Sequence, residues 1–261
     1  MASDVRTQPS PPAATPSLRH TNPHPRAPLK TLRATPRSGS RKAAGARKVR
    51  KRDAAATRAR ILDAAIEEFA ARGLQEVRIE DVALRARANR RMIYYYFGSK
   101  DGLYLAALEQ VYATLAEEER KIDVENLHPV QAITELVRLK IDHYSEHPHY
   151  IAFLNMENLH KARYLRRSRR IEEFKAPLGE IIARVLERGQ RSGLFRKDVD
   201  SVDLYISICA LGYLYFSNQY TLSIIFGRQL ITSKSLQQRK ITVADMIISY
   251  LKTDDSQIKD S

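Results

Sequence analysis

The most constraining feature of this sequence is the spacing of its apolar residues, which follows a helical period from Thr57 almost to the C-terminus. After Thr57, a residue type that caps helices, apolar side chains recur at helical spacing as far as Gly73, a residue type that commonly ends them. They are Ile61, Leu62, Ala65, Ile66, Phe69 and Ala70. No segment alternates apolar and polar residues for long enough to predict a strand. The sequence therefore predicts an all-α fold.

Caps and prolines divide the rest of the chain into further helices. Asn89 and Ser99 are placed to cap helices, and Pro129 and Pro148 fit the first turn of a helix, where a missing N–H costs little. Pro177 lies inside a helical pattern and should kink that helix or split it in two. The sequence predicts helices over about 79–86, 89–96, 100–122, 129–146, 148–160, 168–191, 200–217 and 240–252.

Charge separates an N-terminal tail from the rest of the chain. Of the formal net charge of +14, +12 falls on residues 1–52, which hold eight of the eleven prolines and no aromatic residue. Such a segment cannot bury enough apolar surface to offset its ordering entropy. We expect a disordered basic tail over 1–52, a helix-turn-helix domain over 53–101, a helical domain over 102–254 and a disordered tail over 255–261. The basic tail is either a solubilising extension or an arm that adds phosphate contacts.

Residues 79–100 have the layout of a helix-turn-helix, in which a short helix and a brief turn precede a helix crowded with polar and aromatic side chains. Ile93 and Phe97, four residues apart, can anchor this second helix on apolar residues of the two helices before it. Those residues are Ile61, Ile66 and Val82. The opposite face then carries Asn89, Arg90, Arg91, Tyr94 and Tyr95. Guanidinium and amide groups can reach base edges in a major groove, while tyrosine hydroxyls and Lys100 suit phosphate oxygens, so we expect double-stranded DNA as a partner.

Several motifs stand in order between about residues 53 and 110. They are Thr57-Arg58-Ala59-Arg60-Ile61-Leu62-Asp63-Ala64-Ala65, Phe69-Ala70, Gly73, Asp81-Val82-Ala83 and Met92-Ile93-Tyr94-Tyr95-Tyr96-Phe97-Gly98-Ser99-Lys100. Together they resemble the N-terminal signature of the TetR/AcrR (tetracycline-repressor) family. The resemblance implies a bacterial transcriptional regulator, by the family's habit a repressor, that binds a palindromic operator and is released by a small-molecule inducer. The family's DNA-contact positions fall here on Asn89, Arg90, Arg91, Tyr94, Tyr95 and Lys100.

The chain departs from this family pattern at two places. Family members usually have Gly-Val in the turn where this chain has Arg87-Ala88, and a positive φ at Arg87 would cost about 1 kcal/mol. The family also tends to cap the second helix with Ser or Thr, whereas Val77 and Arg78 stand here. These departures bear on the turn geometry and on a contact by Arg78, not on the presence of the domain.

Two apolar segments near the C-terminus predict a dimer. Residues 202–216 are apolar almost all round, which is typical of a helix buried by its own domain and by a partner subunit. The last helix offers a second apolar stripe, made of Val243, Met246, Ile247, Tyr250 and Leu251. Two such helices from each of two subunits would form a four-helix interface with twofold symmetry. TetR-like proteins typically dimerise in this way, so the resemblance also implies a homodimer.

Polar groups that interrupt apolar helices are candidates for a cavity that binds an unknown small-molecule effector. One cluster of candidates is Tyr144, Phe153, Met156, Glu157, Asn158 and His160. A second cluster is Tyr213, Phe216 and Asn218, followed by Gln219. For each of these residues, core packing or surface exposure is the alternative interpretation.

Histidines gather in the same region and raise the question of a metal. They are His143, His147, His149 and His160. Glu157-x-x-His160 matches half of a di-iron helix motif, but the chain has no second Glu-x-x-His, so we expect no metal and no cofactor. A helical metal-dependent enzyme that uses the His143/His147/His160 region is one alternative function. A DNA-binding activator without an inducer is the other.

Cysteine usage and hydropathy indicate a reducing compartment. The single cysteine, Cys209, excludes an intramolecular disulfide, and its apolar surroundings predict a buried, inert thiol. No secretory signal is visible, and the most apolar stretch, 204–216, is too short and too rich in tyrosine for a membrane span. We therefore expect a cytoplasmic protein that is not an enzyme and has no membrane partner.

Overall fold

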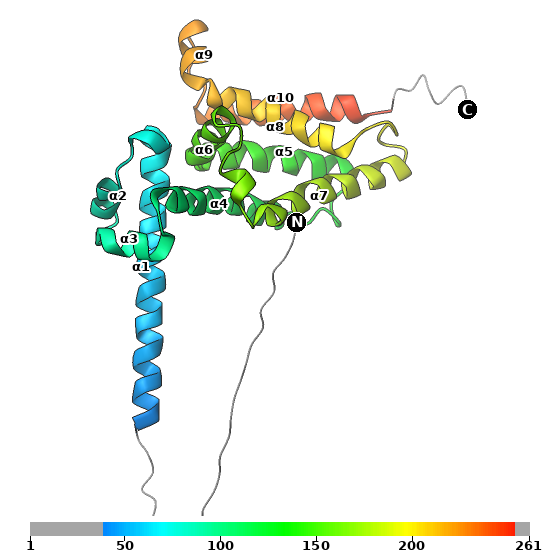
Figure 1. Cartoon of the computed structure of the whole chain (residues 1–261). Coiled ribbons are helices and arrows are strands. Elements are labelled where there is room, and N and C mark those ends of the chain that lie inside the picture. Colours follow the sequence, from blue (N-terminus) through cyan, green and yellow to red (C-terminus); the bar gives the residue numbers. More distant parts are fainter. Residues whose placement is uncertain (1–38, 254–261) are drawn as a thin grey trace, which may run out of the picture. The chain divides into compact units, whose positions relative to one another are not determined.

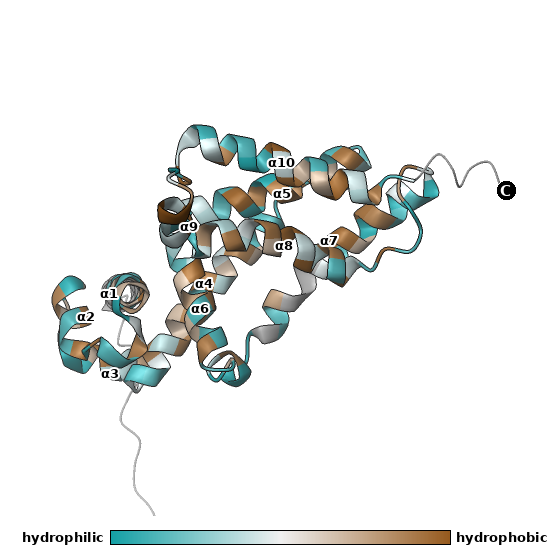
Figure 2. Cartoon of the chain, turned by 90° about the horizontal axis from the view of Figure 1, so that it is seen from above, coloured by the Kyte–Doolittle hydropathy of each residue, from teal (hydrophilic) through white to brown (hydrophobic). Residues whose placement is uncertain are grey.

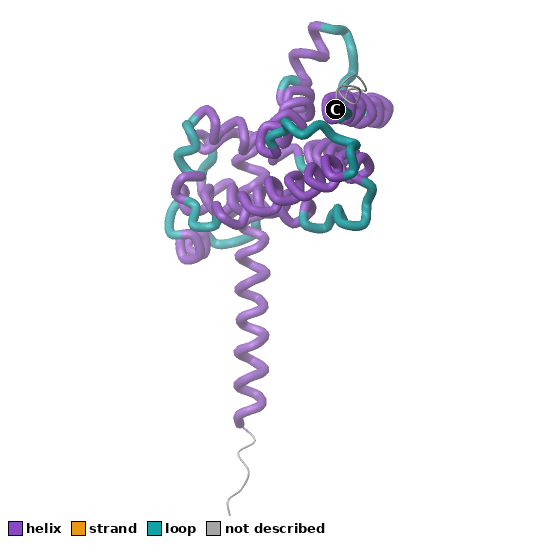
Figure 3. Tube along the Cα trace, turned by 90° about the vertical axis from the view of Figure 1, so that its right-hand side faces the viewer, coloured by secondary structure: helices purple, strands orange, loops and turns teal. Residues whose placement is uncertain are grey.

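The structure, a computed structural model, describes residues 39–253 and, within that range, all side chains except those of 39–52, 171 and 175–178. Over this range the chain forms helices and loops, with one isolated antiparallel bridge between Phe195 and Lys252, so the predicted all-α fold is confirmed (Figure 1, Figure 3). The elements are α1 (Gly39–Glu76), α2 (Ile79–Arg85), α3 (Arg90–Phe97), α4 (Lys100–Glu119), α5 (Pro129–Glu146), α6 (Pro148–Leu159), the 3-10 turn η1 (Leu165–Arg167), α7 (Ile171–Arg191), α8 (Ser201–Ser217), α9 (Gln219–Ile225) and α10 (Ser233–Leu251). No helix between residues 39 and 253 is both long and apolar enough to cross a membrane.

Most helices lie where the sequence predicts them, and the largest difference is at the N-terminus. α1 begins at Gly39, so residues 39–52, which we expected to be disordered, belong to a helix, as their content of Ala, Arg and Lys favours. The remaining parts of the two expected tails, 1–38 and 254–261, lie outside the described residues.

The other differences concern the C-terminal half. α10 begins well before residue 240 because Thr232 caps it, its hydroxyl accepting a hydrogen bond from the backbone N–H of Ser235 at 3.1 Å. α9 and η1 are too short for apolar periodicity to reveal them. α7 runs through Pro177 as a single element, so of the two expected effects, a kink or a split, the split does not occur.

The first three helices close on a small apolar core. Ile61 and Phe69 of α1, Val82 of α2 and Ile93 of α3 are fully buried, and Phe97 is half-buried against them. Burying a side chain of this size contributes about 1.5–3 kcal/mol. The predicted anchoring of α3 through Ile93 and Phe97 is confirmed.

A buried carboxylate ties α1 to α2. Glu68 accepts hydrogen bonds from Arg72 and, at 2.6 Å, from Arg85. Arg72 also reaches Asp81 at 2.7 Å, and Arg85 also reaches Glu67 at 2.5 Å. Burial alone would raise the pKa of Glu68, but the hydrogen bonds and charges of the two arginines outweigh it and lower that pKa. The network holds α2 against α1, which fixes the position from which the turn and α3 begin.

α5 is the central helix of the C-terminal domain and packs against α10, α8 and α7. Figure 2 shows α8 as a largely apolar ribbon next to α5 and α10. Ile133 and Val137 of α5, Leu204 of α8 and Val243 and Leu251 of α10 are buried in the shared core. The second half of α4, the end of α5 and the middle of α8 contribute to the cavity described below.

Tyr104 of α4 joins the two domains. Its buried ring meets Phe69 of α1 edge-on at 5.3 Å between centroids, stacks on Phe153 of α6 at 5.4 Å and contacts Tyr164 at 4.8 Å. Its hydroxyl donates a hydrogen bond to Oε1 of Glu157 at 3.3 Å. Burial, reinforced by Glu157, raises the pKa of Tyr104, so the hydroxyl stays protonated and keeps donating.

The turn between α2 and α3 contains the positive φ at Arg87 that would strain a side chain. Arg87 has a φ of 48°, in the left-handed region that favours glycine. The turn is closed by backbone hydrogen bonds from Arg87 N to Leu84 O at 3.1 Å and from Ala88 N to Ala83 O at 3.0 Å. A side chain at this position is therefore strained.

We expect Arg87→Gly to raise the free energy of unfolding by about 0.5–1 kcal/mol, because the relief of left-handed strain exceeds the extra entropy of the unfolded chain. Arg87→Ala is the matched control, since it removes the same charge but keeps the Cβ atom, and it should leave stability nearly unchanged. Urea unfolding followed by circular dichroism measures both. Equal stability of the two variants would contradict strain at this turn.

Candidate functional site

α3 is fixed at both ends by side chains that cap helices. The side chain of Asn89 accepts a hydrogen bond from the backbone N–H of Arg91 at 2.8 Å, which starts α3. The hydroxyl of Ser99 accepts one from the backbone N–H of Gly102 at 3.0 Å, which starts α4. Both predicted caps are confirmed. Because α4 begins directly after α3, the two caps set the direction in which α3 presents its outer face.

The outer face of α3 carries guanidinium and phenol groups. Tyr95 is 83% exposed and Tyr94 is 42% exposed. Arg91 is exposed and has no side-chain partner among the described residues. Arg90 is also exposed, but its guanidinium donates to Oε1 of Glu80 at 2.7 Å. A surface ion pair of this kind is weak, so the guanidinium can exchange it for another anion.

Two of the six predicted DNA-contact residues already serve the fold. Lys100 donates from Nζ to the backbone carbonyl of Gln75 at 3.2 Å, and the Asn89 side chain caps α3. The other four, Arg90, Arg91, Tyr94 and Tyr95, share the exposed face of α3. Arg87, exposed in the turn before α3, adds a positive charge that we did not include among the contacts. A helix that presents such groups suits the major groove of DNA.

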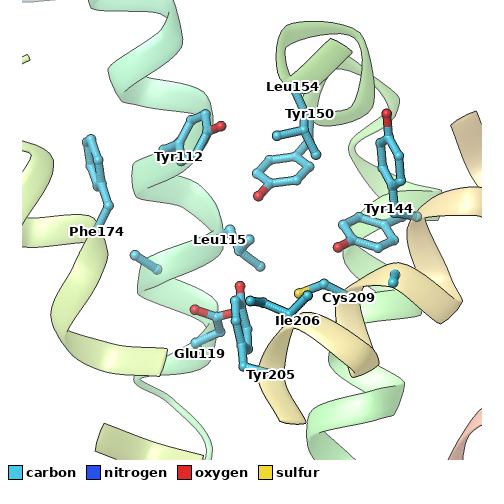
Figure 4. Close-up of a pocket in the computed structure, with 13 residues that line it drawn as sticks. Tyr112, Leu115, Glu119, Tyr144, Tyr150, Leu154, Phe174, Tyr205, Ile206 and Cys209 are labelled. Atoms are coloured by element: carbon cyan, nitrogen blue, oxygen red, sulfur yellow. The ribbon is translucent and has the colours of Figure 1, made fainter. Parts of the chain in front are cut away.

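A second candidate site is a cavity of about 460 Å³ among five helices of the C-terminal domain (Figure 4). Its wall is mostly aromatic and aliphatic. The lining residues are Tyr112, Leu115, Ala116 and Glu119 of α4, Tyr144 of α5, Tyr150 and Leu154 of α6, Phe174 of α7, and Tyr205, Ile206, Cys209, Ala210 and Tyr213 of α8. A cavity of this volume and composition is typical of sites for small organic molecules.

A buried ion pair forms one side of the cavity. The side chain of Glu119 is fully buried and its Oε1 pairs with Nζ of Lys140, whose side chain is 3% exposed. Lys140 also donates to the hydroxyl of Tyr205 at 2.7 Å. The other carboxylate oxygen of Glu119, Oε2, has no hydrogen-bond donor among the described residues. Burial raises the pKa of Glu119, although Lys140 opposes the shift.

Tyrosine hydroxyls supply the remaining polar groups. Burial raises the pKa of Tyr112 to about 12 and raises those of Tyr144, Tyr150 and Tyr205 as well. All four hydroxyls are therefore neutral near pH 7. In Figure 4 the hydroxyls of Tyr144 and Tyr150 point toward the middle of the cavity. Cys209, which we expected to be buried, is half-buried and lines the cavity.

The structure brings two of the nine predicted ligand-binding residues, Tyr144 and Tyr213, to the cavity wall. Phe153 and Glu157 surround Tyr104 instead, and Met156 lies beside Gly73 at the end of α1, where a Cβ atom would be 3.9 Å from its Sδ. Glu157 also accepts hydrogen bonds from two backbone N–H groups after α6, those of Tyr164 at 3.2 Å and Leu165 at 2.9 Å. These three residues therefore pack the junction between the domains.

The other four predicted residues lie around the ends of helices. Asn158 is exposed and donates to Leu154 O at 2.8 Å, and His160 is half-buried just after α6. Phe216 is buried edge-on against Tyr144 at 5.7 Å, and Asn218 is exposed at the end of α8. None of the four is among the residues that line the cavity.

The residues that sequence reasoning missed lie mainly on α4. Tyr112 and Glu119 are seven positions apart, two helical turns, and so face the same side. That spacing is a signal in the sequence, but it does not reveal which helices close the opposite wall. Phe174 of α7 and Tyr205 of α8 complete that wall through contacts between segments far apart in the sequence.

One face of the domain remains apolar and uncovered in the single chain. Residues 202–216 were predicted to be buried by their own domain and by a partner subunit, and in the single chain Val202, Ile206 and Leu214 of α8 are each 55% exposed. Ile241, Met246 and Tyr250 of α10 are exposed as well. So are Tyr220, Ile224, Ile225 and Phe226 in and after α9. Exposed apolar area of this extent is typical of a protein–protein interface.

The half motif Glu157-x-x-His160 does not form a metal site, because Glu157 is engaged at the domain junction. A different group comes together instead. Among the described side chains, Glu118 of α4, His143 of α5 and His147 directly after α5 lie close enough to share a metal ion. Their potential ligand atoms all lie within 4.8 Å of one another.

Two protein-family models match the chain. The model described as "Bacterial regulatory proteins, tetR family" matches residues 61–107, from α1 into α4. The model described as "Tetracyclin repressor-like, C-terminal domain" matches residues 129–247, from α5 into α10. The two matches follow one another in the order of the two domains.

Similar proteins include two curated repressors. The chain is 35% identical over 204 residues to the HTH-type transcriptional repressor NicS of Pseudomonas putida, a match that covers 78% of this chain and 96% of that protein. It is 28% identical over 164 residues to the HTH-type transcriptional repressor SCO4008 of Streptomyces coelicolor, a match that covers 61% of this chain and 78% of that protein.

Solved structures share the fold. A putative transcriptional regulator of Streptomyces coelicolor, SCO4942, superposes with a TM-score of 0.57 at 22% identity, covering 75% of this chain and 98% of that one. A tetR-family regulatory protein from Rhodococcus RHA1 superposes with a TM-score of 0.58 at 16% identity, and the match covers 76% of this chain and 98% of that one.

Proposed function

Because this chain belongs to the tetR family of helix-turn-helix transcriptional regulators, we propose that it is a dimeric repressor that binds a palindromic operator and is released from it by a small aromatic effector. The observation that carries the proposal is that α4 connects the two candidate sites. It follows directly after α3, whose outer face is exposed, and its second half lines the aromatic cavity. The alternative of a metal-dependent enzyme is set aside, since the family consists of regulators. Two similar proteins named as repressors support the direction of control.

Recognition of DNA would depend on α3. Arg91 has no side-chain partner in the described part of the chain, and Arg90 is held by an exposed ion pair and a contact over the ring of Tyr94, so both are available for guanine edges. Tyr94 and Tyr95 extend the same face toward the phosphates. Lys100 would need to leave Gln75 O to contact a phosphate, so we rank it below the other four.

Dimerisation would use the uncovered apolar face. Val202, Ile206, Ala210 and Leu214 follow one another at four-residue spacing, so they form a single stripe along α8. The exposed apolar residues of α10 give the second helix of a four-helix interface. A twofold dimer presents two copies of α3, which matches two half-sites of a palindrome.

The effector would be a small planar aromatic molecule that carries an N–H or O–H donor. Rings from five helices line the cavity, so an aromatic molecule can make stacked or edge-on contacts there. The free Oε2 of Glu119 is a buried acceptor without a donor, which is costly to leave unpaired and favours a ligand that donates to it. A cavity of this kind supports a regulator with an inducer over one without.

α4 would couple the two sites. Its N-terminus follows α3, Tyr104 lies in its first half, and Tyr112 and Glu119 line the cavity in its second half. A ligand that contacts Glu119 can therefore shift the helix that carries the DNA-binding domain. The ligand changes the balance between two arrangements of the recognition helices only if it binds one arrangement more tightly than the other.

We expect Arg91→Ala to weaken binding to the operator by about one to two orders of magnitude, because it removes a base-edge contact. Arg228→Ala, in the loop after α9, removes an exposed arginine elsewhere and should change little beyond a small electrostatic effect. DNA fragments selected from the source genome by the purified protein provide the operator, and fluorescence anisotropy at about 0.15 M salt provides the affinity. Binding of the selected fragment no tighter than a shuffled duplex would contradict sequence-specific recognition.

We expect Leu214→Glu to convert the dimer into a monomer, because the substitution places a charge from each subunit in the apolar face of α8. Leu159→Glu is the matched control, since Leu159 is 78% exposed but lies at the end of α6. Size-exclusion chromatography with light scattering gives the mass of each variant. A Leu214→Glu protein that stays dimeric would place the interface elsewhere.

Two nearly isosteric probes test the cavity, indole with an N–H donor and benzofuran with an oxygen in its place. We expect indole to raise the melting temperature more than benzofuran, because only indole can donate to Glu119. The double variant Glu119→Leu/Lys140→Met replaces the ion pair by apolar groups and keeps the fold. It should respond equally to both probes. Equal shifts by the two probes in the unmodified protein would contradict the role of Glu119.

A further inference from the structure

The group formed by Glu118, His143 and His147, here called the His–Glu cluster, lies outside the cavity and takes no part in the proposed response. His143 lies in the last turn of α5, His147 follows directly after the end of that helix, and Glu118 reaches both from the end of α4. Nδ1 of His143 lies 2.7 Å from Oε2 of Glu118, and Nε2 of His147 lies 3.1 Å from Oε1. One carboxylate thus bridges two imidazoles.

The spacing of these atoms is close to that of a metal site. In a tetrahedral zinc site with bonds of about 2.0–2.1 Å, neighbouring ligand atoms lie about 3.3 Å apart. The two nitrogen–oxygen separations, one to each carboxylate oxygen, need to open by only about 0.2–0.6 Å to reach that value, and the potential ligand atoms of the three residues lie within 4.8 Å of one another. Two imidazoles and a carboxylate are also the protein ligands of several zinc sites that keep a fourth position for water.

The surroundings allow a cation to enter. The His143 side chain is fully buried, while Glu118 and His147 are 29% and 41% exposed, so one side of the cluster is open to solvent. Glu118 and His143 also line a surface hollow of about 660 Å³. In that hollow the acidic side chains outnumber the basic ones, Lys121 and Arg138. The local field therefore favours a cation.

We propose that the His–Glu cluster binds one divalent transition-metal ion, such as Zn²⁺ or Co²⁺, through Nδ1 of His143, Nε2 of His147 and the carboxylate of Glu118. Borderline metals with nitrogen and oxygen ligands suit this set, whereas Mg²⁺ and Ca²⁺ prefer oxygen alone. Each imidazole then carries its N–H proton on the ring nitrogen that does not ligate the ion, Nε2 of His143 and Nδ1 of His147. Water occupies the fourth position on the exposed side.

The site would clamp the end of α4 to the end of α5. Glu118 is followed by Glu119, which lines the cavity, and Lys140, the partner of Glu119, lies three residues before His143. A bound ion therefore restrains both helices that carry the buried ion pair. Because only the folded chain brings the three ligands together, the ion stabilises the folded state.

The test uses the full chain without an affinity tag, freed of metal by a chelator. Co²⁺ is added while visible absorption is recorded, because its d–d bands report nitrogen and oxygen ligation, and Zn²⁺ binding is measured by calorimetry. We expect one ion per chain, displacement of Co²⁺ by Zn²⁺ and a rise in melting temperature with Zn²⁺. We expect His147→Ala and Glu118→Gln to weaken binding at least about 10-fold, since even loss of a residue that only supports a ligand costs 10–100-fold.

His149→Ala is the matched control, because His149 is a half-buried histidine in the same segment but outside the cluster. It should bind Co²⁺ as the unmodified chain does, with the same spectrum. His147 is partly exposed, so its replacement keeps the fold, which circular dichroism verifies. Absence of stoichiometric binding to the unmodified chain would overturn the proposal. Equal affinity in His147→Ala and the unmodified chain would also overturn it, since the ion would then be held by other residues.

Discussion

The contacts of Tyr104 are the constraint on which the rest of the structure depends. The helix-turn-helix is a domain of roughly 50 residues, a size at which a single core gives only marginal stability. Tyr104 extends that core by joining Phe69 of α1 to Phe153 of α6 across α4. Glu157 supports the junction, since it satisfies the Tyr104 hydroxyl and two backbone N–H groups together. The DNA-binding domain is thus stabilised by the domain behind it.

Through these contacts α4 connects the two domains physically, which neither domain could do alone. From Lys100 to Glu119 the helix is about 29 Å long, at about 1.5 Å per residue. It is capped by Ser99 next to α3, packed at Tyr104 and exposed to the cavity at Glu119. A rigid helix packed near its start, at Tyr104, transmits a displacement of its far end as a tilt. Under the proposed function, small changes at the cavity would therefore reorient the recognition helix without unfolding either domain.

Local signals in the sequence predicted the parts of the structure that depend on local interactions. The caps at Asn89 and Ser99 follow from neighbours within a few residues, and the anchoring of α3 by Ile93 follows from the helical spacing of apolar residues. The cavity could not be predicted in the same way, because its wall combines residues from α4 to α8. Glu157 shows why the candidates were misplaced. A polar residue in an apolar helix can line a cavity or satisfy buried donors, and only the tertiary contacts distinguish the two.

The ion pair of Glu119 and Lys140 requires an explanation beyond stability. A buried pair of this kind is about as stable as apolar residues of the same volume, because desolvation offsets the attraction. Stability alone therefore gives no reason for a carboxylate in an otherwise aromatic wall. The pair does orient the carboxylate of Glu119. Lys140 binds one carboxylate oxygen and donates a hydrogen bond to Tyr205. The other oxygen, Oε2, therefore has a fixed position and no donor among the described residues. An apolar wall would accept any ring of the right size, whereas under the proposed function this one would discriminate by a single hydrogen bond.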